Sequence, residues 1–228
     1  MSIIHRTTLV PSKLELLAAW LPAQPWYLHR DRGPELTKAG GFRLDDPQGE
    51  VGIEFMVAVD GSGDGAIAYH IPMTYRSGAL DGASDGLIGN IEHGVLGHRW
   101  VYDGMHDPVL VAQLVALIQG EAQPQAQSVN DAPDPTVASQ AVTNCSLTAI
   151  GSLIAANGPS GTHLRVETTR ADAVPGGQLT VRINRILQPV GSVDSAGQAW
   201  QPCVIGDWKL SDGAQVRGVY AAAQYTGV

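Results

Sequence analysis

The sequence predicts an α+β protein in which an antiparallel sheet, covered by two helices, is followed by a mostly β second half. Three features predict this fold class. Long β-like runs separated by glycine-rich turns begin at Gly41. Two amphipathic stretches with helix-capping signals occupy residues 12–21 and 108–119. A polar segment, residues 121–137, interrupts the chain before the β-like runs resume.

The first elements are a short strand and a helix. Residues 3–9 have strand-like composition, and Pro11 ends the run. Ser12 and Glu15 are spaced as a capping box, which predicts a helix over residues 12–21. The apolar side chains of this helix recur at helical spacing and predict a face packed on the core. They are Leu14, Leu16, Leu17, Trp20 and Leu21.

A long hairpin follows. Residues 52–60 and 66–76 are β-like runs on either side of the turn sequence Gly61-Ser62-Gly63-Asp64-Gly65. Two shorter runs, residues 87–92 and 96–102, come next and are expected to extend the same antiparallel sheet.

The second helix has clear boundaries. Asp107 is placed as its N-cap, Pro108 occupies the first helical position, and Gly120 ends it. Its apolar side chains are Val109, Leu110, Leu114, Leu117 and Ile118. Because each helix has a single strongly apolar face, we expect both to cover one face of the sheet.

The composition of residues 121–137 is typical of a linker or long surface loop. It predicts a first domain over residues 1–120 and a β-rich domain over residues 138–228 that packs on the first. Residues 144–155 fit the period of either a strand or a helix. The other predicted strands are residues 163–169, 178–187, 203–210 and 215–224.

The length, charge and cysteine content of the whole chain exclude several classes of function. The 228 residues carry a net charge of −8, and the 14 Lys plus Arg are scattered, which argues against a nucleic-acid partner. No apolar stretch approaches the roughly 20 residues of a membrane span, and the start lacks a secretion signal, so we expect a cytoplasmic protein with no membrane contact. Cys145 and Cys203 lack metal-ligand spacing and are expected to be free, buried thiols.

Few residues suggest chemistry. His93, His98 and His106 lie close in sequence to Asp107, but turn formation and helix capping explain this cluster better than a metal or proton relay. The glycine-rich residues 61–65 and 158–162 lack the Lys-Ser/Thr ending of a phosphate-binding loop. The sequence therefore predicts no catalytic residue, no metal site and no cofactor, and it favours a protein that is not an enzyme.

Two groups of aromatic residues are candidate binding sites. Trp26 and Tyr27, followed by Arg30 and Arg32, form a candidate interaction surface, although a Trp directly after a helix is more often an anchor to the core. The second group is a candidate ligand platform in the second half. It consists of Trp200, Trp208 and Tyr220.

Three segments, in order, resemble the N-terminal cap of bacterial maltokinases. Leu21-Pro22-Ala23-Gln24-Pro25-Trp26-Tyr27 is similar to the exit of the cap's helix, with Pro25 in place of the usual Arg. Tyr69-His70-Ile71-Pro72-Met73-Thr74-Tyr75-Arg76 resembles a cap strand. Tyr102-Asp103-Gly104-Met105-His106-Asp107-Pro108 resembles the entry into the cap's next helix. The resemblance spans residues 3–120.

The resemblance implies a small sheet-plus-helix unit of cystatin-like shape, which in maltokinases packs on the nucleotide-binding lobe of the kinase that makes maltose 1-phosphate. After Gly120 the chain departs from the family, because residues 121–228 hold no kinase catalytic loop. The resemblance thus implies an actinobacterial accessory or regulatory protein of maltose, trehalose, glycogen or other α-glucan metabolism. Its partner would be a kinase or glucan-metabolising enzyme. The alternative is a carbohydrate-binding module or small enzyme with a pocket in the second half.

The expected assembly follows from the missing kinase surface. The sheet and the region of Trp26 should present apolar area that a monomer rarely exposes. We expect residues after 138 to cover it within the chain, and a homodimer paired through a strand edge is the alternative.

Overall fold

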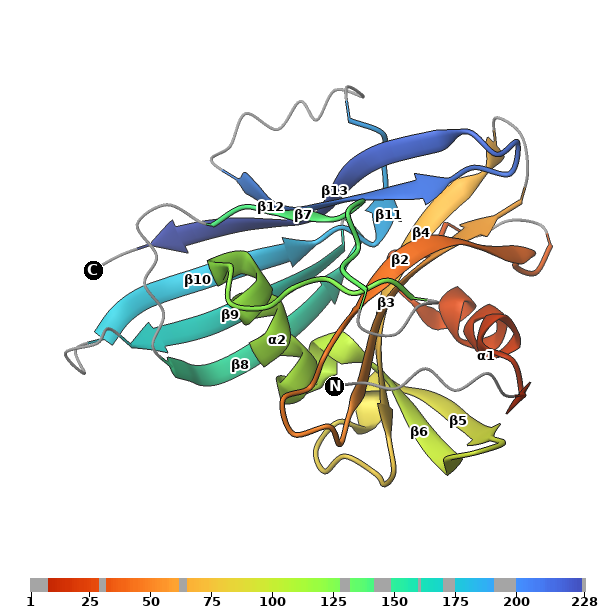
Figure 1. Ribbon diagram of the computed structural model, residues 1–228, viewed down its shortest axis with the longest axis horizontal. Coiled ribbons are helices and arrows are strands. Elements are labelled where there is room, and N and C mark those ends of the chain that lie inside the picture. The colour runs from red at the N-terminus through yellow and green to blue at the C-terminus, as the bar shows by residue number, and fades with distance from the viewer. Residues whose placement is uncertain are drawn as a thin grey trace.

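The computed structural model describes residues 8–28, 32–61, 65–127, 132–141, 149–159, 161–169, 175–190 and 200–226. Its helices are α1 (Lys13–Trp20) and α2 (Pro108–Gln119), with short 3-10 turns at Leu21–Ala23, Ser84–Gly86 and Gly104–His106 (Figure 1). The strands of the first half are β1 (Leu9–Val10), β2 (Leu36–Leu44), β3 (Gly52–Asp60), β4 (Ile67–Arg76), β5 (Leu87–His93) and β6 (Gly97–Asp103). Those of the second half are β7 (Ala138–Ser139), β8 (Ala149–Gly158), β9 (Gly161–Thr169), β10 (Pro175–Ile183), β11 (Ile186–Leu187), β12 (Gln201–Lys209) and β13 (Gln215–Thr226).

These strands hydrogen bond into one antiparallel sheet. The main order is β1-β5-β6-β4-β3-β2-β12-β13-β10-β9-β8, with β11 on β4 and β7 on β12. In the chain, β11 follows β10 after only Asn184 and Arg185, and β11 pairs with β4. The series of paired strands β4-β3-β2-β12-β13-β10 is therefore closed back onto β4 by β11. The result is a closed ring of strands drawn from both sides of residues 121–137.

Helix α2 confirms the sequence prediction at both ends. The Asp107 carboxylate accepts a hydrogen bond from the Val109 N–H at 2.9 Å, and Pro108 is the first helical residue. Gly120 ends the helix with φ of 80°, the left-handed conformation that glycine adopts readily. Six of its apolar side chains are buried, and they are Leu110, Val111, Leu114, Val115, Leu117 and Ile118.

Helix α1 also confirms its predicted start. The Ser12 hydroxyl accepts from the Glu15 N–H at 3.3 Å, and the Glu15 carboxylate accepts from the Ser12 N–H at 2.8 Å. Its face is less buried than predicted, since Leu17 is the buried residue of the helix and Leu21 in the following 3-10 turn is the next. The predicted opening strand is described only as β1, because residues 1–7 lie outside the described residues.

The two helices cover opposite faces of the sheet, so the prediction of one shared face is wrong. Phe55 and Val57 of β3 belong to the buried cluster that contains α2, whereas Met56 and Ala58 belong to the cluster that contains Leu17 of α1. The physical reason lies in β3, which is buried on both faces along almost its whole length. A strand with apolar side chains of both parities needs a cover on each side.

The predicted hairpin of residues 52–60 and 66–76 is confirmed as β3 and β4, and β5 and β6 extend the sheet as expected. Strand β2 was missing from the prediction. It contains Gly40 and Gly41, weak strand formers, and its register shifts between Lys38 and Gly40. Gly41 has φ of 118°, and a Cβ there would lie 1.9 Å from the Phe55 carbonyl oxygen, so only glycine fits.

The second half is β-rich, as predicted. Residues 149–158, for which a helix was the alternative, form β8, while residues 142–148 lie outside the described residues. The predicted strand over residues 178–187 is divided, because the chain leaves β13 after Ile183 and pairs with β4 from Ile186. Strands β9, β12 and β13 confirm the remaining predictions.

The larger buried cluster joins the two halves. Phe42 and Phe55 of the first half share it with Val181, Trp208 and Tyr220 of the second. Stacked rings mark the contact, since Phe42 lies 4.4 Å from Phe55 and 6.3 Å from Tyr220 between ring centroids. Elements on both sides of residues 121–137 therefore share one core.

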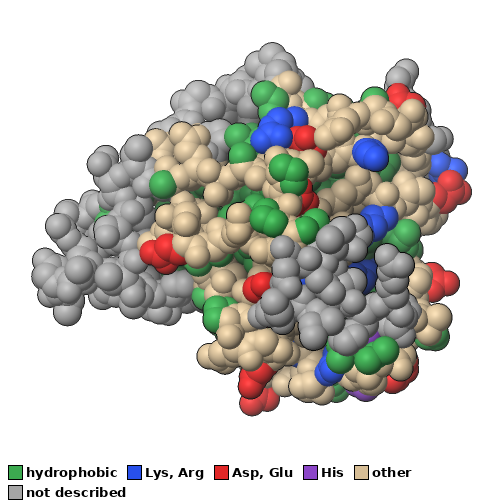
Figure 2. Space-filling view, viewed as in Figure 1, with side chains coloured by type: hydrophobic (Ala, Val, Ile, Leu, Met, Phe, Trp, Pro, Cys, Tyr) green, Lys and Arg blue, Asp and Glu red, His purple; other side chains and the backbone are tan. Residues whose placement is uncertain are grey.

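The described surface mixes charge types. On the face shown in Figure 2, Lys and Arg side chains lie apart from one another, among acidic and uncharged ones. The exposed large apolar residues are Val10, Leu28, Val95, Leu96, Ile154 and Val190.

Candidate functional site

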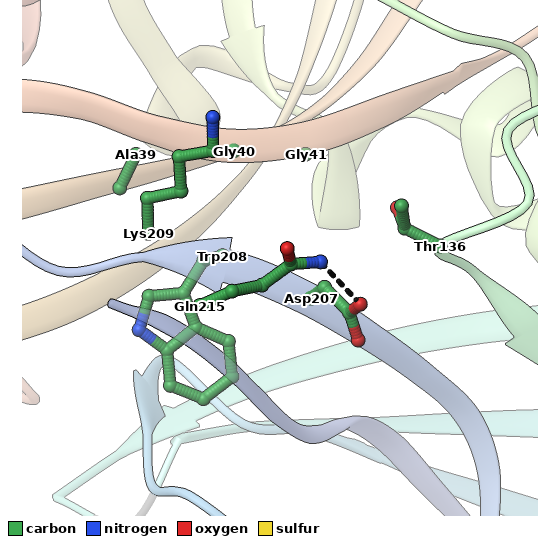
Figure 3. A pocket seen from close by; sticks show the side chains of 8 residues that line it. All are labelled: Ala39, Gly40, Gly41, Thr136, Asp207, Trp208, Lys209 and Gln215. Atoms are coloured by element: carbon green, nitrogen blue, oxygen red, sulfur yellow. Dashed lines mark hydrogen bonds between the residues drawn. The ribbon is translucent and has the colours of Figure 1, made fainter. Parts of the chain in front are cut away.

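A hollow of about 150 Å³ lies where β2 of the first half meets β12 of the second (Figure 3). Both halves line it, together with the segment that precedes β7 and the start of β13. The lining residues are Ala39, Gly40, Gly41, Thr136, Asp207, Trp208, Lys209 and Gln215.

The hollow exists because β2 and β12 approach closely at one point. Among the described residues, the two strands pair only at Trp208 and Gly40. A Cβ at Gly40 would lie 3.0 Å from the Asp207 carbonyl oxygen and 3.2 Å from the Trp208 Cα, so this approach favours glycine. Because the described pairing of β2 with β12 is limited to this one position, the strands diverge on either side of it and leave the hollow between them.

The hollow offers polar groups of several kinds. The Asp207 carboxylate accepts hydrogen bonds from Gln215 Nε2 at 2.8 Å and from Arg217 Nη1 at 2.6 Å. Arg217 also donates to the Thr136 carbonyl oxygen at 3.1 Å, which ties the segment before β7 to β13. In Figure 3 the Lys209 side chain extends towards β2. Donors and acceptors side by side suit a ligand with hydroxyl groups.

The predicted ligand platform is not formed. Trp208 lines the hollow, but its side chain points into the core and is 2% exposed. Tyr220 is likewise buried, and its hydroxyl donates to the Asp207 carbonyl oxygen at 2.9 Å. Trp200 lies elsewhere, beside His163 and Arg182. Strand alternation explains why Trp208 is not exposed, because in β12 its side chain faces the core while those of Asp207 and Lys209 face outward.

The predicted interaction surface is mostly core. Trp26 is 1% exposed, and its ring centroid lies 6.0 Å from that of Tyr69. Tyr27 is also buried, and its hydroxyl donates to Asp60 at 3.3 Å. Arg32 is exposed and pairs with Glu35 at 3.0 Å. Arg30 lies outside the described residues. Trp26 and Tyr27 therefore anchor the chain after α1, the interpretation that the sequence favoured.

A buried ion pair, which the sequence analysis missed, connects the halves. Arg185 is fully buried between β10 and β11, and its Nη2 donates to Asp103 at the end of β6. Its Nε donates to the Thr162 hydroxyl of β9 at 2.8 Å. The guanidinium lies 5.0 Å from the ring centroid of Trp26. The available signal was Asn184-Arg185, a polar pair between two apolar strands.

His70 lies next to this ion pair in the shared core. Its Nδ1 donates to the Asn184 carbonyl oxygen at 3.2 Å, and its ring centroid lies 4.6 Å from that of Tyr220. Burial and the nearby positive charge of Arg185 lower the pKa of His70 to about 3, against the smaller opposing effect of the Asn184 hydrogen bond. The imidazole is therefore neutral near pH 7.

A second buried carboxylate, Glu54 of β3, lies on the α1 side of the sheet. It accepts hydrogen bonds from Lys13 at 2.5 Å, from the Tyr75 hydroxyl at 2.6 Å and from Gln127 at 3.1 Å. Burial opposes ionisation, but Lys13 and the Tyr75 hydrogen bond outweigh it and hold the pKa of Glu54 below its usual value. The same burial, together with the Glu54 charge, raises the pKa of Tyr75.

The histidine cluster has structural contacts. His93 Nδ1 accepts from the N–H groups of Val95 and Leu96, and His98 lies 2.6 Å from Glu92. Asp107 caps α2 and also receives two hydrogen bonds of 2.7 Å from Arg76. In the part of the chain that the structure describes, no group of three His, Cys, Asp or Glu side chains could hold a metal ion.

Cys203 is a free, buried thiol, as predicted, and burial raises its pKa to about 12, which keeps it protonated and unreactive. Cys145 lies outside the described residues. Within the described ranges, no helix is long and apolar enough to cross a membrane.

Comparison with known proteins supports the resemblance found in the sequence. No curated protein sequence matches the chain. A family model does match, over a segment that runs from the end of α1 through β2 to β6 and stops at the N-cap of α2. Residues 20–107 match the model of the maltokinase N-terminal cap domain, so this part of the chain is similar to that domain and the predicted resemblance is confirmed.

Proposed function

We propose that this chain is an accessory protein of maltose, trehalose or α-glucan metabolism that acts by binding an enzyme of those reactions rather than by catalysis. The match of residues 20–107 to the maltokinase cap domain is the observation that carries the proposal. The proposal includes a cystatin-like shape for the first half of the chain, which is supported by the packing of α1 over one face of β3 and β4.

The use of the buried acids supports binding over catalysis. Asp107 caps α2, Asp103 pairs with Arg185, and Glu54 pairs with Lys13. Each carboxylate is held by a cation or a backbone donor that fixes the fold. A general acid or base instead needs access to substrate. These groups are better suited to holding a rigid binding surface.

The β5–β6 turn gives the cap-like half an apolar contact surface. Val95 is 60% exposed and Leu96 44% exposed, and we call this pair the hairpin tip. The His93 ring accepts from both their N–H groups, at 3.2 and 3.0 Å, which fixes the backbone of the turn. Apolar side chains on a rigid turn lose little entropy when they bind, so the tip favours a protein partner.

Sedimentation velocity with the purified chain and purified maltokinase from the same organism tests the proposal. We expect a complex that the Val95→Asp/Leu96→Asp variant weakens by roughly tenfold or more, because an interface would bury two apolar side chains. Val190→Asp is the matched control, since Val190 is 67% exposed and lies in the second half. Absence of a complex with maltokinase and with the trehalose and glycogen enzymes would overturn the proposal.

A second candidate is a saccharide-binding module that uses the hollow between β2 and β12, supported by the donors and acceptors at Asp207 and Gln215. Calorimetric titration with maltose, trehalose, glycogen and ATP separates the two. A saturable sugar signal that Asp207→Asn abolishes would favour this candidate over the accessory function.

A further inference from the structure

Strands β5 and β6 present a tryptophan on the face of the sheet that points away from α1. Ile91 and Val101 are buried in the cluster that contains Leu17 of α1, so the residues that alternate with them face the other way. Among these, Trp100 is half-buried and lies directly opposite Asn90 in the register. Trp100 belongs to neither of the two buried clusters of described residues, so core packing does not explain its large ring.

Polar side chains lie beside this tryptophan on the same face. Directly paired residues of antiparallel strands project from the same side of a sheet, which places Asn90 of β5 next to Trp100. Two residues along the hairpin, Glu92 lies opposite His98, and His98 Nδ1 is 2.6 Å from a Glu92 carboxylate oxygen. The rings of His98 and Trp100 meet edge to face, with 5.9 Å between their centroids. We call Asn90, Glu92, His98 and Trp100 the Trp100 site.

The segment between β4 and β5, residues 77–86, borders the Trp100 site at one end. Tyr102 lies two residues from Trp100 on the same face of β6 but is only 2% exposed, and its hydroxyl accepts from the Leu80 N–H at 2.9 Å. This segment therefore covers Tyr102 and leaves the half-buried ring of Trp100 beside its edge.

The hydrogen-bonding groups of this site are available to a ligand. The Asn90 side chain is exposed, and within the described ranges neither its amide nor the indole N–H of Trp100 makes a hydrogen bond. The Glu92 carboxylate has one oxygen against His98, which leaves its second oxygen as an acceptor. The site therefore combines an aromatic surface with donors and acceptors beside it.

The charges around the Trp100 site do not favour an anion. Arg76 of β4 lies opposite Trp100 on the other side of β6, but its guanidinium donates two hydrogen bonds of 2.7 Å to Asp107. A phosphorylated ligand would also meet the exposed carboxylate of Glu92. Since the neighbouring guanidinium is already paired and the free acceptor is an acid, a neutral ligand fits better.

We propose that the Trp100 site binds a neutral saccharide, with one pyranose ring against the indole of Trp100. The C–H groups on one face of a pyranose carry partial positive charge and match the negative face of an aromatic ring, while the hydroxyls lie at the sugar's rim. Asn90 and Glu92 are placed to hydrogen bond those hydroxyls, so the site has the mixture of apolar surface and a few polar groups that ligand sites use. It is separate from the hollow between β2 and β12 and does not depend on the proposed protein partner.

Isothermal titration calorimetry of the full chain with maltoheptaose and with cellohexaose tests this inference. We expect saturable binding of at least one of these neutral oligosaccharides. Trp100→Ala should weaken binding by roughly tenfold through the loss of stacking, and Asn90→Ala by roughly threefold to tenfold through the loss of one hydrogen bond. Arg99→Gln is the matched control and should leave the affinity unchanged, because Arg99 lies next to Trp100 in β6 but pairs with Ile91 on the α1 side of the sheet.

The variants keep the outcome clear. Trp100→Ala could disturb the packing of β6, whereas Asn90 is exposed and its variant should fold normally, as near-ultraviolet circular dichroism can show. Absence of binding of both oligosaccharides would overturn the proposal, as would equal affinity of the wild type and Asn90→Ala. Binding that Asp207→Asn abolishes would place the saccharide in the hollow instead and would also overturn it. Loss of maltokinase binding in the hairpin-tip variant, with saccharide binding intact, would concern the proposed function alone.

Discussion

Among the buried carboxylates with cationic partners, Asp103 and Glu54 differ in how far water reaches the ion pair. The side chains of Asp103 and Arg185 are 1% and 0% exposed, and the pair joins strand β6 to the segment between β10 and β11. The side chain of Glu54 is 5% exposed, but that of Lys13 is 31% exposed, and both residues belong to the first half.

The comparison separates a buried ion pair from a partly hydrated one. When one member of a fully buried pair is lost, the other remains charged where water cannot solvate it. When Lys13 is lost, water and the Tyr75 hydroxyl can still stabilise the Glu54 carboxylate. The two sites therefore differ in how strongly the fold depends on the charge.

The largest expected effect is that of Arg185→Met. We expect a loss of about 3–5 kcal/mol in the free energy of unfolding, because the Asp103 carboxylate would be left buried without a cation, with only the Met105 N–H donating to it. Urea denaturation monitored by tryptophan fluorescence measures it. Arg32→Met is the control, since Arg32 and Glu35 are both exposed, and it should cost less than about 1 kcal/mol.

The Arg185→Met/Asp103→Leu double variant identifies the cause. It removes both charges and should recover part of the lost stability. If the double variant is no more stable than Arg185→Met, the loss comes from the packing of the guanidinium against Trp26 and not from an unpaired carboxylate.

His70 makes the region of the Arg185 pair sensitive to acid. Its pKa of about 3 in the folded protein lies below the ordinary 6.5, so between these values the unfolded chain binds a proton that the folded protein does not. Stability is therefore lost as the pH falls from 6.5 towards 3, by up to about 1.4 kcal/mol per pH unit from this group.

Urea denaturation of the wild type and His70→Gln across pH 7 to 4 isolates this contribution, because other groups titrate in both proteins. We expect the difference in stability between the two to change with pH below 6.5 and to be constant above it. A constant difference over the whole range would show that His70 titrates normally. Arg185→Met should narrow the pH range over which His70 destabilises the fold, since the Arg185 charge, after burial, helps to lower this pKa.

The smallest effect is expected at Lys13. Lys13→Met should cost about 1 kcal/mol or less, because the ammonium is partly solvated. Glu54→Gln should cost about 1–3 kcal/mol, because it removes the charge from three hydrogen bonds. Chemical denaturation at pH 7 measures both. A loss at Lys13 as large as that at Arg185 would contradict the distinction between the two sites.

The stability of Lys13→Met should also differ from that of the wild type in its dependence on acid. The pKa of Glu54 lies below its usual 4.5, so its contribution is present above that value and is lost as the pH falls through the lowered pKa. The Lys13→Met variant should lose stability at a higher pH than the wild type, since its Glu54 would protonate sooner.

Local signals in the sequence determined several elements correctly. Asp107, Pro108 and Gly120 set the ends of α2, and Ser12 with Glu15 set the start of α1. These interactions join residues within one helical turn, so the sequence contains both partners at a fixed spacing. The β3–β4 hairpin is local in the same sense, because its turn and its strands are contiguous.

The candidate site could not be predicted in this way. Its lining comes from Ala39 to Gly41, Thr136, Asp207 to Lys209 and Gln215, four segments that meet only after β2 and β12 pair. Of these residues the sequence analysis named only Trp208 as a candidate ligand contact, as part of a platform that the structure does not form.

The sequence by itself determined which residues cap helices, turn the chain or must be buried, because those preferences depend on near neighbours and on side-chain polarity. Tertiary structure decided which face of β3 each helix covers and that Arg185 pairs with Asp103. It also decided that the side chains of Trp208 and Tyr220 point inward. These choices depend on contacts between distant segments, such as that between Asp103 and Arg185, which are 82 positions apart in the sequence. Many alternative arrangements of the strands and helices would bury similar apolar area, and only the complete set of contacts selects one of them.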